Sequence, residues 1–135
     1  MEKKISVTTT AKREVVDITE QINGILPGEG GQGLCHLFLL HTTAALTTAD
    51  LDPGTDLDML DAFEELIPKL KFRHPHDPSH TPDHILSSLI GTSLSVPVKN
   101  GKLVLGTWQR VVLVEFYGPR KREIVVTFTP KTAKA

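Results

Sequence analysis

Four of the six histidines fall between positions 74 and 84, beside two aspartates. Imidazole and carboxylate groups are the usual ligands of zinc and other transition metals, and together they form the usual acid–base pair. The spacing matches no closed structural zinc site, and there are no paired cysteines. We interpret His76 and His80 as residues of a solvated loop. His74 and His84 adjoin apolar anchors, Phe72 and a helix, so we expect these two to take part in chemistry.

His84 is expected in the first turn of a helix, because Thr81 fits the N-cap and Pro82 fits the first helical position. Free backbone N–H groups and the positive end of the helix dipole favour anions there. Ser87, Ser88 and Gly91 follow at i+3, i+4 and i+7 on the same stripe. This stripe predicts a cofactor-binding or phosphate-binding surface, or the close approach of another backbone. An exposed helix face explains the same pattern equally well.

His41 ends the apolar run Leu34–Leu40, and catalytic groups often sit at the ends of buried strands. A histidine capping a strand can equally be structural. Downstream, Asp50 and Asp52 stand at even spacing before the first long helix. Their carboxylates could ligate Mg²⁺ or hold histidine ligands in place.

The apolar segment Trp108–Tyr117 carries Gln109 and Glu115 on one face by alternation. A carboxylate on so apolar a strand is costly unless it is paired, which makes Arg120 or Arg122 the expected partner of Glu115. The basic run at 120–122 could clamp phosphate or form an ordinary solvated turn. Signatures of nucleotide hydrolysis, dinucleotide redox chemistry and the common hydrolases are missing from the sequence.

The elements that must position these residues follow from periodicity and turn signals. Strands are predicted over Lys4–Thr10, Glu14–Ile18, Leu34–Leu40, Ser93–Val98, Lys102–Gly106, Trp108–Tyr117 and Arg122–Phe128. Helices are predicted over Glu20–Leu26, from Thr55 to about Leu70, and from Thr81 to about Ile90. The expected class is α+β, a two-layer fold with helices on one face of a mainly antiparallel sheet. Val111–Val114 is apolar on both faces, so its second face should meet another sheet or another subunit.

Composition narrows the function classes. The 135 residues suit one domain, 1–135, with 39% hydrophobic and 23% charged residues. Fifteen basic and 16 acidic residues give a net charge of −1, which argues against nucleic-acid or membrane-surface binding by bulk charge. The start MEKKISVTTT lacks the apolar core of a signal peptide. The single cysteine, Cys35, is expected in the core, and a cytoplasmic location follows from these features.

Three segments together are similar to one known family: HTTAALTTADLDP at 41–53, FRHPHDPSHTPDHILSSLIG at 72–91 and NGKLVLGTWQRVVLVEFYGPRKR at 100–122. They resemble the YjbQ family, also labelled secondary thiamine-phosphate synthase enzymes, over nearly the whole chain. The resemblance implies a two-layer fold, a homotrimer and a histidine–acid cluster matched by His41, His74 and His84, with Gln109 and Arg120 as further site positions. The sequence departs where many relatives carry an Asn–Glu pair, since Asp50 here lies one residue closer.

The resemblance and the residues together predict an enzyme acting on a phosphorylated small molecule with a divalent metal, including thiamine-phosphate synthase activity. In that prediction His41, His74 and His84 hold the metal or move protons, Asp50 or Asp52 assists, and Arg120 with the start of the 84–91 helix binds phosphate. Histidines favour zinc, manganese or nickel, whereas carboxylates with phosphate favour magnesium. The alternatives are a non-catalytic module that binds a phosphate metabolite or metal, and a structural oligomer with an incidental histidine-rich surface.

Overall fold

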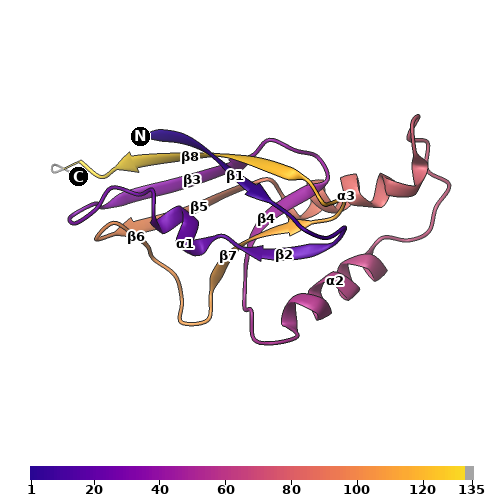
Figure 1. Ribbon diagram of the computed structural model, residues 1–135, viewed down its shortest axis with the longest axis horizontal. Coiled ribbons are helices and arrows are strands. Elements are labelled where there is room, and N and C mark those ends of the chain that lie inside the picture. Colours follow the sequence, from indigo (N-terminus) through magenta and orange to yellow (C-terminus); the bar gives the residue numbers. More distant parts are fainter. Residues whose placement is uncertain (133–135) are drawn as a thin grey trace.

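The computed structural model describes residues 1–132. Its strands are β1 (Glu2–Thr8), β2 (Glu14–Asp17), β3 (Gly33–Leu39), β4 (Ala44–Ala49), β5 (Ser93–Lys99), β6 (Lys102–Leu103), β7 (Arg110–Glu115) and β8 (Lys121–Pro130). Its helices are α1 (Thr19–Asn23), α2 (Thr55–Leu66), the 3-10 turn η1 (Pro78–His80) and α3 (Thr81–Ile90) (Figure 1). No helix in this described part is long and apolar enough to cross a membrane.

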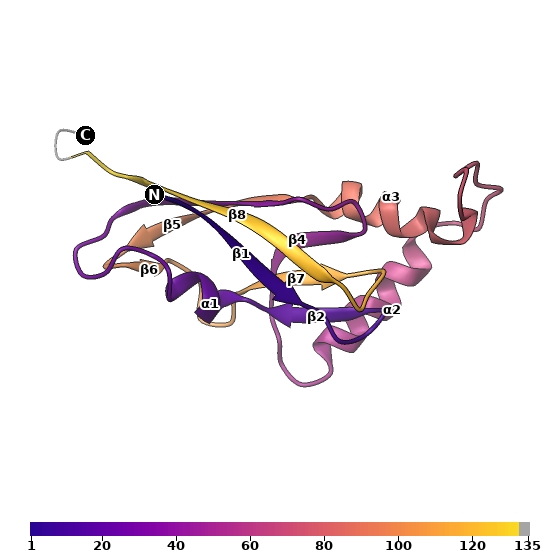
Figure 2. The same ribbon diagram turned by 45° about the horizontal axis from the view of Figure 1, so that its top comes forward.

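The strands form two antiparallel sheets. The larger sheet has the order β1-β8-β3-β5-β6, and the smaller has the order β2-β7-β4. Along β3, Cys35, Leu37 and Leu39 are buried, whereas Leu34 and Phe38 on the other face are 44% exposed. The buried face packs against the smaller sheet, and the two inner faces form the main core between them. Figure 2 shows the larger sheet above the smaller one.

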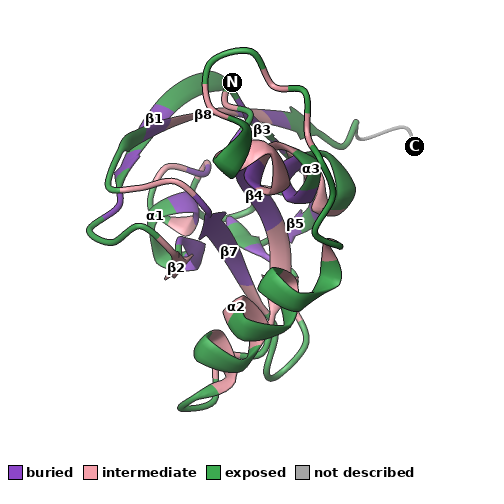
Figure 3. Ribbon diagram, turned by 90° about the vertical axis from the view of Figure 1, so that its right-hand side faces the viewer, coloured by how far each residue is buried: buried purple, intermediate pink, exposed green. Residues whose placement is uncertain are grey.

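Strand β7 is buried on both faces because it lies between two layers. Val111 and Leu113 join the core between the sheets. Val112 and Val114 face the other way and pack with Leu86 of α3 and with partly buried side chains of α2. Figure 3 shows β7 as buried, between the larger sheet and the helices. The two-sided apolar strand is therefore explained within one chain by the second sheet, and it gives no support to a subunit contact.

The α+β class with antiparallel pairing is confirmed, and the boundaries of several elements differ from prediction. Helix α2 begins at Thr55 as predicted but ends at Leu66, since Ile67 is extended before Pro68. Strand β7 is shorter than the predicted Trp108–Tyr117 segment. Strand β4 was not predicted. The single domain predicted over 1–135 includes residues 133–135, which lie outside the described residues.

Candidate metal and anion site

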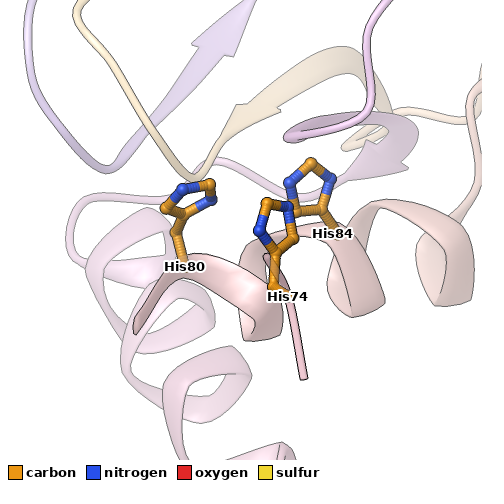
Figure 4. Close-up of side chains that lie close together, drawn as sticks. All are labelled: His74, His80 and His84. Atoms are coloured by element: carbon orange, nitrogen blue, oxygen red, sulfur yellow. The ribbon is translucent and has the colours of Figure 1, made fainter. Parts of the chain in front are cut away.

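Three imidazoles converge at the start of α3. His74 comes from the loop after α2, His80 ends η1, and His84 lies in the first turn of α3 (Figure 4). One ring nitrogen of each lies within 4.8 Å of the others. Because η1 runs directly into α3, His80 and His84 stand four residues apart on one helical face. The ring of His74 stacks on that of His84, with centroids 5.0 Å apart and planes 20° apart.

Asp77 shapes the segment that carries these rings. Its Oδ1 accepts hydrogen bonds from the backbone N–H of Ser79 at 3.0 Å and from the Ser79 hydroxyl at 2.5 Å, and these bonds lower the pKa of Asp77. Its Oδ2 lies 3.8 Å from Nε2 of His80. Partial loss of solvent, then the neighbouring His80 and His84, lower the pKa of His74. These surroundings favour the neutral form of the His74 imidazole, the form that binds metals.

The nitrogen pattern fits a metal. Nδ1 of His80 is buried and has no hydrogen-bond partner among the described residues. A buried imidazole nitrogen left without a partner is unfavourable, and coordination to a cation would satisfy it. Asp77 contributes charge nearby, since its Oδ2 lies 3.8 Å from the other nitrogen of His80, which is too long for a hydrogen bond. Three imidazoles with an open fourth position are typical of catalytic zinc.

A cavity of about 620 Å³ adjoins the cluster and is basic on its other side. His80 and His84 line it from the helical side, and Arg120, Lys121 and Arg122 line it from the β7–β8 turn and the start of β8. The turn packs tightly on the loop between β1 and β2, because a Cβ on Gly118 would approach the carbonyl oxygen of Ala11 to 2.2 Å. This arrangement can bind an anion next to a metal.

Glu115 and Arg122 form a buried ion pair beneath this cavity, with exposed fractions of 0% and 2%. Arg122 donates from Nε to Glu115 Oε1 at 2.8 Å, and its Nη2 donates to Glu115 Oε2 and to Oγ1 of Thr43. Burial alone would raise the pKa of Glu115, but the hydrogen bonds from Arg122, the Tyr117 N–H and Thr9 hold that pKa below its usual value. The predicted need for a partner is confirmed, and Arg122 is that partner.

Tyr117 joins the two sides of the cavity. Its ring stacks on that of His80 with centroids 4.7 Å apart and planes 20° apart. The guanidinium carbon of Arg120 lies 4.9 Å from the centre of the same ring, within the range of a cation–π contact. Nε of Arg120 also donates to the carbonyl oxygen of Tyr117 at 2.9 Å. One aromatic ring thus contacts both a cluster histidine and the arginine of the cavity wall.

His41 lines the cavity but is outside the three-histidine group. Its Nε2 accepts the backbone N–H of Glu123 at 2.9 Å, so this nitrogen is already occupied. Burial, and then the positive charge of Arg122, lower the pKa of His41. The group that the structure brings together is therefore His74, His80 and His84, in place of the predicted His41, His74 and His84.

The interpretation of His80 as a residue of a solvated loop is wrong, because its side chain is only 16% exposed and lies in the cluster. The i, i+4 spacing of His80 and His84 could have indicated that their side chains share one helical face. That spacing spans Thr81-Pro82, where a helix was expected to start, so His80 was placed outside the helix. His76 is exposed.

The remaining predicted residues lie elsewhere. Asp50 and Asp52 line a separate cleft with the exposed Trp108. Gln109 lies beside this cleft, where its Oε1 accepts the backbone N–H of Gly106 at 3.1 Å and its Nε2 donates to the hydroxyl of Thr48 at 3.0 Å. None of these side chains lines the histidine cavity.

The small residues of α3 are structural in their contacts. Ser87 is buried and donates to the carbonyl oxygen of Ala44 in β4 at 2.7 Å. Gly91 ends the helix with φ 110°, and its carbonyl oxygen accepts the N–H of Leu46 at 3.0 Å. Ser88 is exposed and is not among the residues that line the cavity. These contacts hold α3 on β4 and so fix the position of His84.

The fold and the cavity define a small α+β protein with a histidine cluster beside a basic pocket. The chain belongs to the family described as "UPF0047 protein YjbQ-like", whose model matches residues 3–131. The family resemblance predicted from the motifs is thus confirmed.

A UPF0047 protein of Archaeoglobus fulgidus is 41% identical over 119 residues, covering 87% of this chain and 93% of that protein. YugU, a UPF0047 protein of Bacillus subtilis, is 38% identical over 124 residues, covering 90% of this chain and 94% of YugU. The crystal structure of a YbjQ-like protein of unknown function from Sulfolobus solfataricus has a TM-score of 0.86 at 32% identity and covers 97% of both chains.

We expect His41 to make the metal-free protein sensitive to mild acid. Folding lowers the pKa of His41, so the unfolded chain binds the proton more tightly, and stability falls as the pH drops below about 6.5, the ordinary pKa of a histidine. Urea unfolding between pH 7.5 and 5.5 should show a shallower pH dependence for His41→Gln than for the wild type. The control His76→Gln, at an exposed position, should retain the wild-type slope. Equal slopes for His41→Gln and wild type would contradict this role.

Proposed function

We propose that this chain is a metal-dependent enzyme that acts on a phosphorylated small molecule. The observation that supports this most strongly is the His74, His80, His84 group, with one buried unpartnered nitrogen, beside a cavity with Arg120 and Lys121 in its wall. A cation site next to a basic, partly apolar pocket suits a substrate with a phosphoryl group on a small organic body.

The donor set favours zinc over magnesium, because magnesium prefers oxygen ligands and the three converging groups are imidazoles. His74, His80 and His84 would hold the ion, and Asp77 would hold the turn that carries His80. A bound divalent cation would act as a Lewis acid and neutralise charge on the phosphoryl oxygens.

The chain's own residues would bind and orient the substrate. Arg120 and Lys121 would reduce the negative charge of a phosphoryl group in the cavity, and Tyr117 would keep Arg120 in place. His41, with Nε2 occupied by the Glu123 N–H, would hold its proton on Nδ1 and so could donate a hydrogen bond from that atom.

The finer proposal is thiamine-phosphate synthase activity, which the family resemblance suggests. In that reaction a C–N bond forms between the thiazole nitrogen of a thiazole phosphate and the methylene carbon of a pyrimidine pyrophosphate. The C–O bond to the pyrophosphate breaks, and pyrophosphate leaves with the bonding electrons. Positive charge from Arg120 and Lys121 would stabilise this leaving group.

Metal binding is tested with tag-free protein. We expect about one zinc ion per chain by elemental analysis, in line with a three-histidine site. His80→Ala should lower the zinc affinity by more than about tenfold, since it removes a ligand. His76→Ala is the matched control, because that imidazole is exposed and outside the group. Undiminished zinc affinity in His80→Ala would exclude this metal site.

Turnover is tested with zinc- or manganese-loaded protein and the pyrimidine and thiazole phosphates. We expect thiamine phosphate and pyrophosphate to form, and His84→Ala to lower the rate by about a hundredfold, as loss of a metal ligand does. His76→Ala is the control, because that imidazole is exposed and belongs neither to the cavity lining nor to the three-histidine group. Calorimetric phosphate binding without product over a long incubation would favour the alternative, a non-catalytic phosphate- or metal-binding module.

The homotrimer stays a prediction, as does the cytoplasmic location. Leu34 and Phe38 on the outer face of β3, and Leu40 just after the strand, are each 44% exposed, and such side chains beside a central strand are suited to a subunit contact. Light scattering should give three times the monomer mass, and Phe38→Glu should lower that mass, whereas Leu57→Glu on exposed α2 should not. A monomer at micromolar concentration would refute the trimer.

Asp50, Asp52 and Gln109 lie outside the histidine cavity of their own chain. They could act only in the histidine cavity of a neighbouring subunit.

A further inference from the structure

The floor of the cavity carries a donor that no part of the described chain uses. Arg122 lines the cavity although its residue is only 2% exposed. Its Nε and Nη2 donate to Glu115 and Thr43. Its other terminal nitrogen, Nη1, donates to no group in residues 1–132, and it is not among the atoms fully closed off from solvent. A guanidinium carries five N–H donors in a rigid fork, so two of them remain for a ligand.

The network around Arg122 fixes the direction of those donors. Glu115 holds the guanidinium through two hydrogen bonds, and it is held in turn by the Tyr117 N–H at 3.1 Å and the Thr9 hydroxyl at 2.8 Å. The hydroxyl and the backbone carbonyl oxygen of Thr43 both accept hydrogen bonds from Nη2 of Arg122. Because the side chains of Arg122, Glu115, Thr9 and Thr43 are buried, the guanidinium has little freedom to turn, and binding an anion costs little side-chain entropy.

The basic residues therefore differ in depth. Arg120 and Lys121 are exposed and belong to the rim, whereas Arg122 lies at the floor. Rim charges attract an anion of any shape. A floor donor with so little exposure can be reached only by oxygens at the end of a ligand, since a phosphodiester carries a substituent on each side of phosphorus.

Resting on the proposed phosphoryl-binding function, we propose that Arg122 anchors a terminal phosphoryl group through Nη1, and that the site selects phosphate monoesters over diesters. Glu115 is a positioning residue in this arrangement, because it touches Arg122 and not the ligand. Charge-assisted hydrogen bonds from arginine to phosphate are short and strong, so this single contact accounts for a large share of the selectivity.

The test is calorimetry on zinc-loaded protein with inorganic phosphate, methyl phosphate and dimethyl phosphate as probes. Arg122→Lys keeps the charge but loses the fork, and it should weaken inorganic phosphate and methyl phosphate binding by about tenfold or more. The preference for methyl phosphate over dimethyl phosphate should shrink in the same variant. Zinc affinity should change by less than about twofold, because no histidine of the cluster bonds to Arg122.

Arg110→Lys is the matched control, since Arg110 is also ion-paired, to Asp17 and Glu20, but does not line this cavity. The Arg110→Lys variant should leave phosphate binding unchanged.

If Arg122→Lys does not fold, the double variant Glu115→Gln/Arg122→Met removes the buried charges together. It should fold and should bind phosphate as weakly as is expected of Arg122→Lys. Wild-type phosphate affinity in either folded variant, or equal binding of methyl and dimethyl phosphate by the wild type, would overturn the inference alone. If the wild type does not bind phosphate, both the role of Arg122 and the proposed function are overturned. If Arg122 anchors phosphate but no turnover is found, the role of Arg122 is supported and the proposed catalytic function is not.

Discussion

The buried ion pair between Glu115 and Arg122 is the constraint on which the cavity depends. Glu115 ends β7 of the smaller sheet and Arg122 lies near the start of β8 of the larger sheet, so one pair joins the two sheets where they meet the helices. Removing one partner of such a pair typically costs about 3–5 kcal/mol, whereas an apolar replacement of both is often neutral. Net stability therefore does not explain the pair. What it supplies is geometry, since it holds the Thr43 segment and the β7–β8 turn, both of which line the cavity.

The histidine cluster is held by different means. Prolines at 75, 78 and 82 limit the backbone of the segment before α3, and Asp77 caps the turn that carries His80. Helix α3 is in turn held on β4 by the buried Ser87 hydroxyl. The imidazoles are thus positioned by a restricted loop and a packed helix, and the basic groups by strand ends. Two rigid frameworks face one another, which is the arrangement that preorganises a binding site.

Local patterns were sufficient for the elements with strong signals. The strand at 34–40 and the start of α2 at Thr55 are properties of short segments, and each was predicted. The nearly continuous apolar run also indicates burial of this strand on both faces, which is wrong, because Leu34 and Phe38 are 44% exposed. Strand β4 was missed because Ala44–Ala49 combines alanine and threonine without alternation, and its pairing with β7 is a long-range property. The partner of Glu115 was predictable because an unpaired buried carboxylate is so unfavourable. The separation of Asp50 and Asp52 from the histidines was not predictable from the sequence, since side-chain types indicate chemistry but not distance.

The role of His80 shows how tertiary contacts decide between two interpretations of the same residue. By sequence it belongs to a proline-rich loop, and most histidines in such loops are solvated. Its ring is instead covered by Tyr117, which the β7–β8 turn brings across from the far side of the cavity. The Tyr117 ring also contacts Arg120. Because one aromatic side chain touches both the histidine cluster and the basic rim, the positions of the two are linked. When a ligand draws Arg120 inward, the Tyr117 ring either stays stacked on His80 and loses its contact with Arg120, or it follows Arg120 and shifts His80 as well.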